Sequence, residues 1–299
     1  MQTRARPLHC VGFMSNMIAM GRIARGWALT KQSWAVLKAD RSLLVFPLIS
    51  ALASLLAVAL IMGPGFAVFG EGDSEVTLYI LGVLALYVAT FVTVFFNTAL
   101  AAAAAQSLGG KDTTLGDGLS VARSRIGAIF AWSLVQATVG IVIQVIQDAL
   151  RGNIIGRILG SLLSFAWGAA TFFVVPVLAL EGLGPRDAFK RSISLLRERW
   201  GEGVVGSGAI GLAVFLAFLL PLAATIGGGI ALLNSGSDAP GGVLLGVGVL
   251  LFIAMMAISG ALNSIFRVAL YQYATTGATS GGFSPDQLQS AFRPRRGRR

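Results

Sequence analysis

Six long stretches of the chain contain no charged residue, and they constrain the fold more than any other feature. They cover residues 42–70, 76–110, 126–147, 158–180, 203–237 and 239–266. A helix needs about 20 mostly apolar residues to cross the hydrocarbon core of a bilayer, and each stretch is long enough. The sequence therefore predicts an all-α integral membrane protein with six transmembrane helices, arranged as three hairpins.

The composition excludes a water-soluble fold. The chain has 299 residues, of which 55% are hydrophobic and 12% charged, and its mean hydropathy is +0.78. Soluble domains carry about 25% charged residues. The net charge of +10 could suggest a nucleic-acid partner. However, the cations lie between and beside the apolar stretches, as topology signals do, so no nucleic-acid binding is predicted.

The distribution of basic residues predicts the orientation of the chain. If the six stretches cross the membrane in turn, 21 of the 23 lysines and arginines fall on one side. Cytoplasmic segments of membrane proteins carry this excess of positive charge, the positive-inside rule. We therefore expect a multi-pass protein of the bacterial cytoplasmic (inner, plasma) membrane with both termini in the cytoplasm.

Two basic segments have the spacing of amphipathic helices. Within residues 174–203, the apolar Phe189, Ile193, Leu196 and Trp200 share one helical stripe, and most charges lie on the other side. Residues 22–41 show a similar pattern with tryptophans on one face. Such helices lie flat in the headgroup layer. We expect cytoplasmic interfacial helices of this kind, one before each hairpin.

The chain divides into three regions and contains an internal echo. Residues 1–19 are expected to be a disordered extension or a misassigned start, 20–281 the six-span membrane domain, and 282–299 a basic cytoplasmic tail. Asn97-Thr98 precedes Gln106 at the same spacing as Asn263-Ser264 precedes Gln272. Fixed spacing is typical of repeats, although apolar segments also resemble one another by chance. A three-fold repeat of helix hairpins is one interpretation.

Two segments resemble a known class of proteins. Residues 22–50 and 172–201 are similar to uncharacterised six-span membrane proteins of actinobacterial type. The second segment also resembles the membrane domain of some glycerophosphodiester phosphodiesterases, on Pro176, Glu181, Ala188 and Ser192. The resemblance covers roughly residues 20–281 and implies an all-helical membrane fold. It does not imply diesterase activity, because the hydrolase of those proteins is a separate soluble domain.

The sequence offers no catalytic constellation. Its one histidine, His9, and one cysteine, Cys10, lie outside the apolar stretches. A serine nucleophile inside the membrane would need a nearby base, and a metal centre would need more ligands. We predict a non-enzymatic protein with no catalytic residue, no metal ligand and no cofactor.

Two sets of residues are candidates for binding. Asn97, Gln136, Gln144 and Asn263 lie within the apolar stretches and would line a polar cavity, or else join helices by hydrogen bonds. Lys190, Arg191, Arg197 and Arg267 would contact anionic lipids, or else only anchor the topology. We therefore expect membrane lipids, especially anionic ones, as partners.

Three functions follow from these sets. The first is a non-enzymatic protein that interacts with lipids or envelope components. The second is a transporter of a small solute or lipid. The third is a scaffold or assembly partner for other membrane proteins.

Overall fold

The structure is a computed structural model. It describes residues 30–68, 75–150, 152, 154–199, 206–277, 279 and 281–283. Within these ranges every regular element is helical. Residues 30–39 form a helical segment that leads into η1 (Arg41–Leu44), α2 (Val45–Val68), α3 (Glu75–Leu108), α4 (Leu115–Ser124), α5 (Ile126–Ala149), α6 (Ile154–Ala170), α7 (Val174–Leu180), α8 (Pro185–Arg199), α9 (Gly206–Asn234) and α10 (Asp238–Thr276).

Six segments of this structure are long and apolar enough to cross a membrane. They are Arg41–Gly65, Val76–Leu108, Ile126–Ala149, Ile154–Leu180, Leu212–Asn234 and Asp238–Thr276. The prediction of an all-α protein with six membrane-length helices is thus confirmed at the level of length and composition. The predicted extension 1–19, most of the tail 282–299 and the start of the basic segment 22–41 lie outside the described residues.

Two of the segments differ from the sequence prediction. The fourth is not one helix, because turns at 171–173 separate α6 from α7. The sixth continues ten residues beyond Phe266, the last residue of its apolar stretch. The charge of Arg267 ends that stretch without ending the helix. The helix continues because Val268, Ala269, Leu270 and Tyr271 are all buried there.

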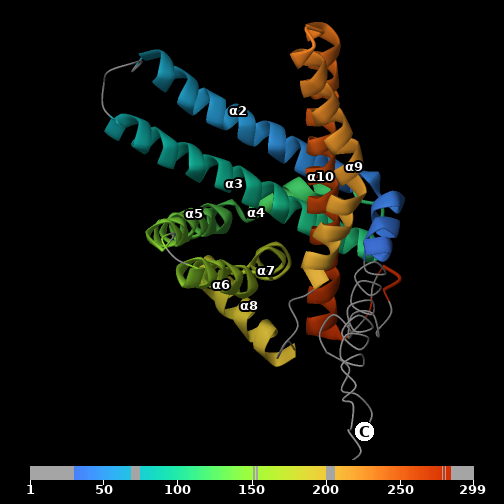
Figure 1. Ribbon diagram of the computed structural model, residues 1–299. Coiled ribbons are helices and arrows are strands. Elements are labelled where there is room, and N and C mark those ends of the chain that lie inside the picture. Colours follow the sequence, from blue (N-terminus) through green and yellow to red (C-terminus); the bar gives the residue numbers. More distant parts are fainter. Residues whose placement is uncertain are drawn as a thin grey trace, which may run out of the picture.

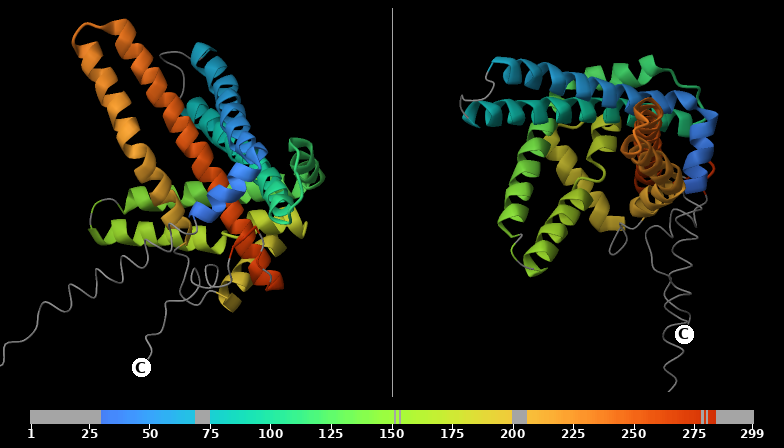
Figure 2. Two further views of the ribbon diagram at one scale, coloured as in Figure 1. Left: turned by 90° about the vertical axis from the view of Figure 1, so that its right-hand side faces the viewer. Right: turned by 45° about the horizontal axis from the view of Figure 1, so that its top comes forward.

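The long helices lie in pairs that diverge from a shared base (Figures 1 and 2). α2 lies along α3, α9 along α10, and α5 beside α6. Away from the base the helices expose large apolar side chains, among them Leu52, Leu60, Ile80, Val83, Val145, Leu162, Leu220, Ile230, Val243 and Leu250. Water would penalise this exposed surface, whereas the hydrocarbon core of a bilayer would solvate it.

The base is a single buried cluster, which we call the hub. It joins the starts of α2, α5 and α9 and the ends of α3 and α10 to α4, α7 and α8. Its fully buried members include Leu43, Phe46, Leu100, Ile129, Phe173, Leu178, Leu195, Ile210, Leu262, Phe266 and Leu270. The helix ends gathered here are those that the charge distribution predicts to face the cytoplasm.

Small residues let α4 approach α3 closely within the hub. Ala99 and its alanine neighbours on α3 are buried, and Gly118 of α4 lies against them. A Cβ added at Gly118 would lie 2.6 Å from the Ala99 carbonyl oxygen and 2.8 Å from Cζ of Phe46. Backbone atoms yield little, so this position requires glycine.

Gly118→Ala is therefore expected to destabilise the protein. Overpacking costs about 1–3 kcal/mol, and the better helix propensity of alanine returns about 0.5–1 kcal/mol. We expect a net loss of about 1–2 kcal/mol, measured by denaturant titration in detergent. Gly116→Ala is the matched control on the same helix, because its Cβ would meet only Thr114 Oγ1 at an ordinary 3.5 Å. Equal stability of the two variants would contradict the close approach.

α4 begins with a capping box. Thr114 is the N-cap, and its hydroxyl accepts from the backbone N–H of Asp117. The Asp117 carboxylate in turn accepts from the Thr114 hydroxyl at 2.7 Å and from the Thr114 N–H at 2.9 Å. These two hydrogen bonds hold the pKa of Asp117 below its usual value, and the one from the Thr114 hydroxyl has the larger effect. Asp117 thus fixes the start of α4 through local hydrogen bonds.

A polar contact fixes the entry to α2 against the loop before α4. Asp40 caps η1 by accepting from the Ser42 N–H at 3.1 Å and from the Ser42 hydroxyl at 2.6 Å. Its other carboxylate oxygen accepts from the Thr113 hydroxyl. Asp40 thus connects two segments that are far apart in the sequence, on the same side of the molecule as the hub.

Candidate functional site: the polar groups around span four

The break in span four is closed by one side chain of α8. Turns at 171–173 free backbone groups that a continuous helix would pair internally. Ser192 is fully buried, accepts from the Phe173 N–H at 3.1 Å and donates to the Ala170 carbonyl at 2.7 Å. Buried backbone groups need partners of this kind. Ser192 therefore holds α8 against both halves of span four.

Three aromatic rings pack the same junction from the side. Trp132 of α5 stacks on Trp167 of α6, with ring centroids 6.1 Å apart. Phe189 of α8 lies 5.7 Å from Trp167 and 6.2 Å from Trp132. The rings connect the α5–α6 pair to α8, so the break lies inside a packed assembly.

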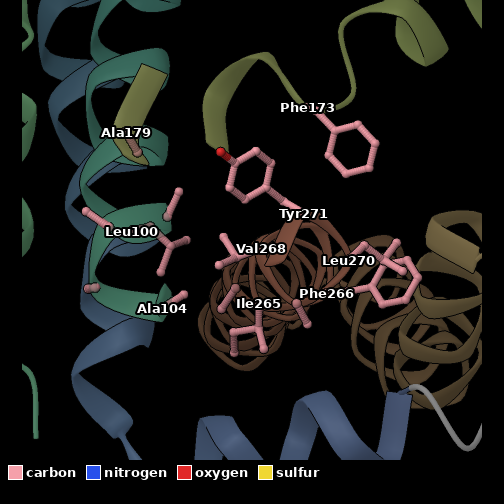
Figure 3. Close-up of a cluster of buried hydrophobic side chains, with 14 of the residues drawn as sticks. Leu100, Ala104, Phe173, Ala179, Ile265, Phe266, Val268, Leu270 and Tyr271 are labelled. Atoms are coloured by element: carbon pink, nitrogen blue, oxygen red, sulfur yellow. The ribbon is translucent and has the colours of Figure 1, made fainter. Parts of the chain in front are cut away.

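Glu181, the C-cap residue of α7, is the centre of a polar cluster that joins three helices. One carboxylate oxygen, Oε1, accepts from the Tyr271 hydroxyl at 2.5 Å and from Arg191 Nε at 3.1 Å. Tyr271 projects from α10 toward the α7 segment, as Figure 3 shows. A single carboxylate thus joins α7, α8 and α10, which we call the Glu181 cluster.

A second arginine covers the turn after Glu181. Gly182 has a positive φ of 67°, which glycine adopts without strain. A Cβ at Gly182 would overlap the Arg125 guanidinium, so that side chain lies directly on the turn. Arg125 comes from the junction of α4 and α5. Its Nε is closed to solvent and has no acceptor within the described part of the chain.

Arg267 lies one helical turn before Tyr271 on α10. Its guanidinium carbon is 4.9 Å from the centre of the Phe172 ring. The side chain is half-buried, and its Nε is closed to solvent with no hydrogen-bond partner among the residues described. Arg267 is thus held over an aromatic ring, outside the Glu181 cluster.

The four residues predicted to contact anionic lipids separate into different environments. Lys190 and Arg197 are exposed on α8 and line a hollow of about 450 Å³ together with Ile193 and Ser194. Arg191 pairs with Glu181, and Arg267 packs on Phe172. The structure therefore brings only Lys190 and Arg197 together on one outward face.

The four residues predicted to line a polar cavity lie on three helices. Gln136 and Gln144 are exposed on α5, whereas Asn97 and Asn263 are half-buried on α3 and α10. The Asn263 amide donates within its own helix, to the Ser259 carbonyl at 2.8 Å. That the four residues share a cavity stays a prediction.

Gln147, three residues after Gln144, makes hydrogen bonds between helices, which is the alternative to lining a cavity. Gln147 of α5 donates to the Gly160 carbonyl at 3.0 Å and to the Ser164 hydroxyl at 2.6 Å, both on α6. Gly160 is required at this crossing, since a Cβ there would lie 2.8 Å from Gln147 Cγ. The polar residues of α5 therefore include at least one that joins two helices.

No group of three or more histidine, cysteine, aspartate or glutamate side chains suited to a metal ion occurs among the described residues. His9 and Cys10 lie outside them. A smaller hollow of about 300 Å³ lies between α3, α4 and α7, and its lining combines small and apolar residues with Gln106 and Lys111. The ends of α3 and α7 meet at this hollow, and their carbonyl groups disfavour an anion there.

Residues 75–282 match the profile of a protein family of unknown function, DUF6159. The chain belongs to the DUF6159 family. The match includes α3 to α10, and with them the broken span and the Glu181 cluster, but not α2 or η1. Comparison with curated proteins gives no match. For this DUF6159 protein, the likeness to the membrane domain of glycerophosphodiester phosphodiesterases and the actinobacterial type stay expectations from the sequence.

The residues quoted for that likeness all have structural roles in the DUF6159 protein. Pro176 and Ala188 are buried in α7 and α8, Ser192 closes the break, and Glu181 centres the polar cluster. These four residues therefore contribute to the packing of α7 and α8 in the hub and against α10. These contacts hold the helices together, and none of them assembles a nucleophile with a base.

Proposed function

We propose that this DUF6159 protein is a non-enzymatic multi-pass membrane protein that binds anionic lipids at its cytoplasmic face. The observation that carries the proposal is the division of α8 into two faces. Ala188, Ser192 and Leu195 are buried in the hub. Lys190 and Arg197 are exposed and line the 450 Å³ hollow with the apolar Ile193 between them.

This combination matches the chemistry of a lipid headgroup region. Each lysine or arginine near an anionic leaflet contributes about 1 kcal/mol of attraction. The aliphatic parts of these side chains and Ile193 would contact the upper acyl chains. In this proposal α8 lies in the plane of the cytoplasmic interface, as the amphipathic sequence pattern predicts.

The placement of the rest of the chain follows from the same proposal. The three helix pairs act as transmembrane hairpins, and their exposed apolar side chains contact lipid. The hub then lies at the cytoplasmic side with both termini, consistent with the basic residues in the segments that adjoin it. The bacterial cytoplasmic membrane is the corresponding location.

Transport is the second candidate, because span four is discontinuous. Transporters often bind substrates where broken helices expose backbone groups. Here, however, Ser192 occupies the Phe173 N–H and the Ala170 carbonyl, and the surroundings of the break are buried. The broken span therefore supports a packing role more strongly than a substrate site.

The lipid proposal is tested with the double variant Lys190→Gln/Arg197→Gln. Protein is extracted from membranes of mixed phosphatidylglycerol and phosphatidylcholine, and the co-purifying lipids are quantified by mass spectrometry. We expect wild type to enrich phosphatidylglycerol and the double variant to lose most of that enrichment. At about 1 kcal/mol per cation, each substitution should weaken the preference about five-fold.

The matched control is Lys111→Gln/Arg123→Gln, which also removes two exposed positive charges, here outside α8. It should keep the enrichment of phosphatidylglycerol. Loss of enrichment in both double variants would show that the net charge of the protein, and not α8, causes the enrichment of phosphatidylglycerol. Unchanged enrichment in Lys190→Gln/Arg197→Gln would reject α8 as the lipid-binding face.

A further inference from the structure

Arg267 is a permanent charge in a half-buried place and has no acidic partner among the residues that the structure describes. The arginine side chain stays protonated in proteins. Its described interaction is with the Phe172 ring, 4.9 Å away, and its Nε has no acceptor within the described ranges. Tyr271 and Arg191 already share Oε1 of Glu181, the carboxylate at the end of α7.

Such an arrangement calls for an anion. Burial removes water from a charged group, and buried charges are normally paired. Contact with an aromatic face recovers only part of the lost hydration. The guanidinium carries its N–H donors in one plane, so it can make a planar, two-point contact. Phosphate oxygens suit that geometry, since arginine binds them through two parallel N–H groups.

The position of Arg267 along α10 indicates where the anion comes from. Arg267 lies 29 residues after Asp238, the first residue of α10. At 1.5 Å per residue the helix advances about 44 Å over that length. The hydrocarbon core is about 30 Å thick, and about 40–45 Å with the headgroup layers. If Asp238 lies at the outer surface, Arg267 reaches the headgroup layer of the inner leaflet.

We propose that Arg267, held on Phe172, binds the phosphodiester group of a membrane phospholipid. The inference rests on the membrane placement given above, but not on the lipid-binding role of α8. The two sites differ in what they select. The basic α8 selects lipids that carry a net negative charge. Arg267 binds the phosphate itself, so it accepts zwitterionic phosphatidylcholine as well as phosphatidylglycerol.

The test compares wild type with Arg267→Met, purified in a neutral detergent and stripped of lipid. Without lipid, Arg267→Met should melt at the same temperature as wild type or higher, because it removes an unpaired half-buried charge. A residue that only packs or anchors would instead lower the melting temperature. Dioleoyl phosphatidylcholine is then titrated into both proteins.

Phosphatidylcholine should raise the melting temperature of wild type by about 5 °C at saturation and leave that of Arg267→Met unchanged. Phe172→Leu keeps the charge but removes the ring, and should need at least ten-fold more lipid for half of the effect. Dioleoylglycerol has the same acyl chains without phosphate and should shift neither protein. Inorganic phosphate should also have no effect.

Three results would overturn the proposal. One is a lipid response of Arg267→Met equal to that of wild type. Another is a response to dioleoylglycerol as large as that to phosphatidylcholine. The third is stabilisation by inorganic phosphate alone, which would make the ligand a free anion. Lys190→Gln/Arg197→Gln should keep the phosphatidylcholine response, so failure of α8 and failure of Arg267 are distinguished.

Discussion

Replacing Ser192 by alanine is expected to cost about 2–4 kcal/mol of stability, the largest of the effects that we predict. The substitution leaves two groups without their partner: the fully buried Phe173 N–H and the carbonyl of the half-buried Ala170. An unpaired buried group costs about 1–3 kcal/mol, and two are created here. Denaturant titration in detergent, followed by tryptophan fluorescence, measures the loss.

Ser161→Ala is the matched control for this experiment. The Ser161 hydroxyl is exposed on α6 and donates only to the Arg157 carbonyl of its own helix, so its removal should change stability by less than about 0.5 kcal/mol. Ser192→Thr keeps the hydroxyl and should recover part of the stability if the added methyl group is accommodated. A Ser192→Ala protein as stable as the control would show that the break needs no side-chain partner.

The second large effect is expected from Tyr271→Phe, which removes the 2.5 Å hydrogen bond to Glu181. Hydrogen bonds to charged groups contribute about 1.5–3 kcal/mol, and this one joins two elements of the hub. Arg191→Gln should cost less, about 0.2–1 kcal/mol, because the side chains of Arg191 and Glu181 are 37% and 25% exposed. Water screens their attraction.

A double-mutant cycle measures the coupling directly. Tyr271→Phe combined with Glu181→Gln should cost less than the sum of the two single variants, because both remove the same contact. Ser161→Ala, on α6 and outside the cluster, serves as the additive control. Strict additivity of Tyr271→Phe and Glu181→Gln would contradict the Glu181 cluster.

Charge-free length and helical spacing made the helices of this fold predictable from the sequence. Six charge-free stretches correspond to six membrane-length helical segments, because charge-free length is what crossing a membrane requires. The basic segment after Pro185 also becomes a helix as its spacing predicts. These are local properties of the chain, so a single sequence contains the information.

Contacts between distant segments were not predictable in the same way. Nothing local marks Tyr271 as the partner of Glu181, ninety residues earlier in the chain. The charge pattern does not reveal the break in span four, since residues 171–173 lie inside a charge-free stretch. The local signal is Pro176, which cannot donate to the Phe172 carbonyl four residues earlier and so interrupts the helix there. Ser192 was noted for its resemblance to a motif, but its role in closing the break depends on how α8 packs. Residue type also does not distinguish the glutamines of α5. Gln136 is exposed, whereas the half-buried Gln147 joins α5 to α6 by a hydrogen bond.

The side of the membrane on which the hub lies is the central claim of this account, and cysteine labelling tests it most directly. On a Cys10→Ala background, Lys111→Cys places a thiol in the exposed loop between α3 and α4, beside the hub. Ser235→Cys places one in the exposed turn between α9 and α10, at the far end of that pair.

A membrane-impermeant maleimide is applied to inside-out and right-side-out vesicles. We predict that Lys111→Cys reacts only in inside-out vesicles and Ser235→Cys only in right-side-out ones. Reaction of both thiols from the same side would contradict the six-span arrangement with a cytoplasmic hub.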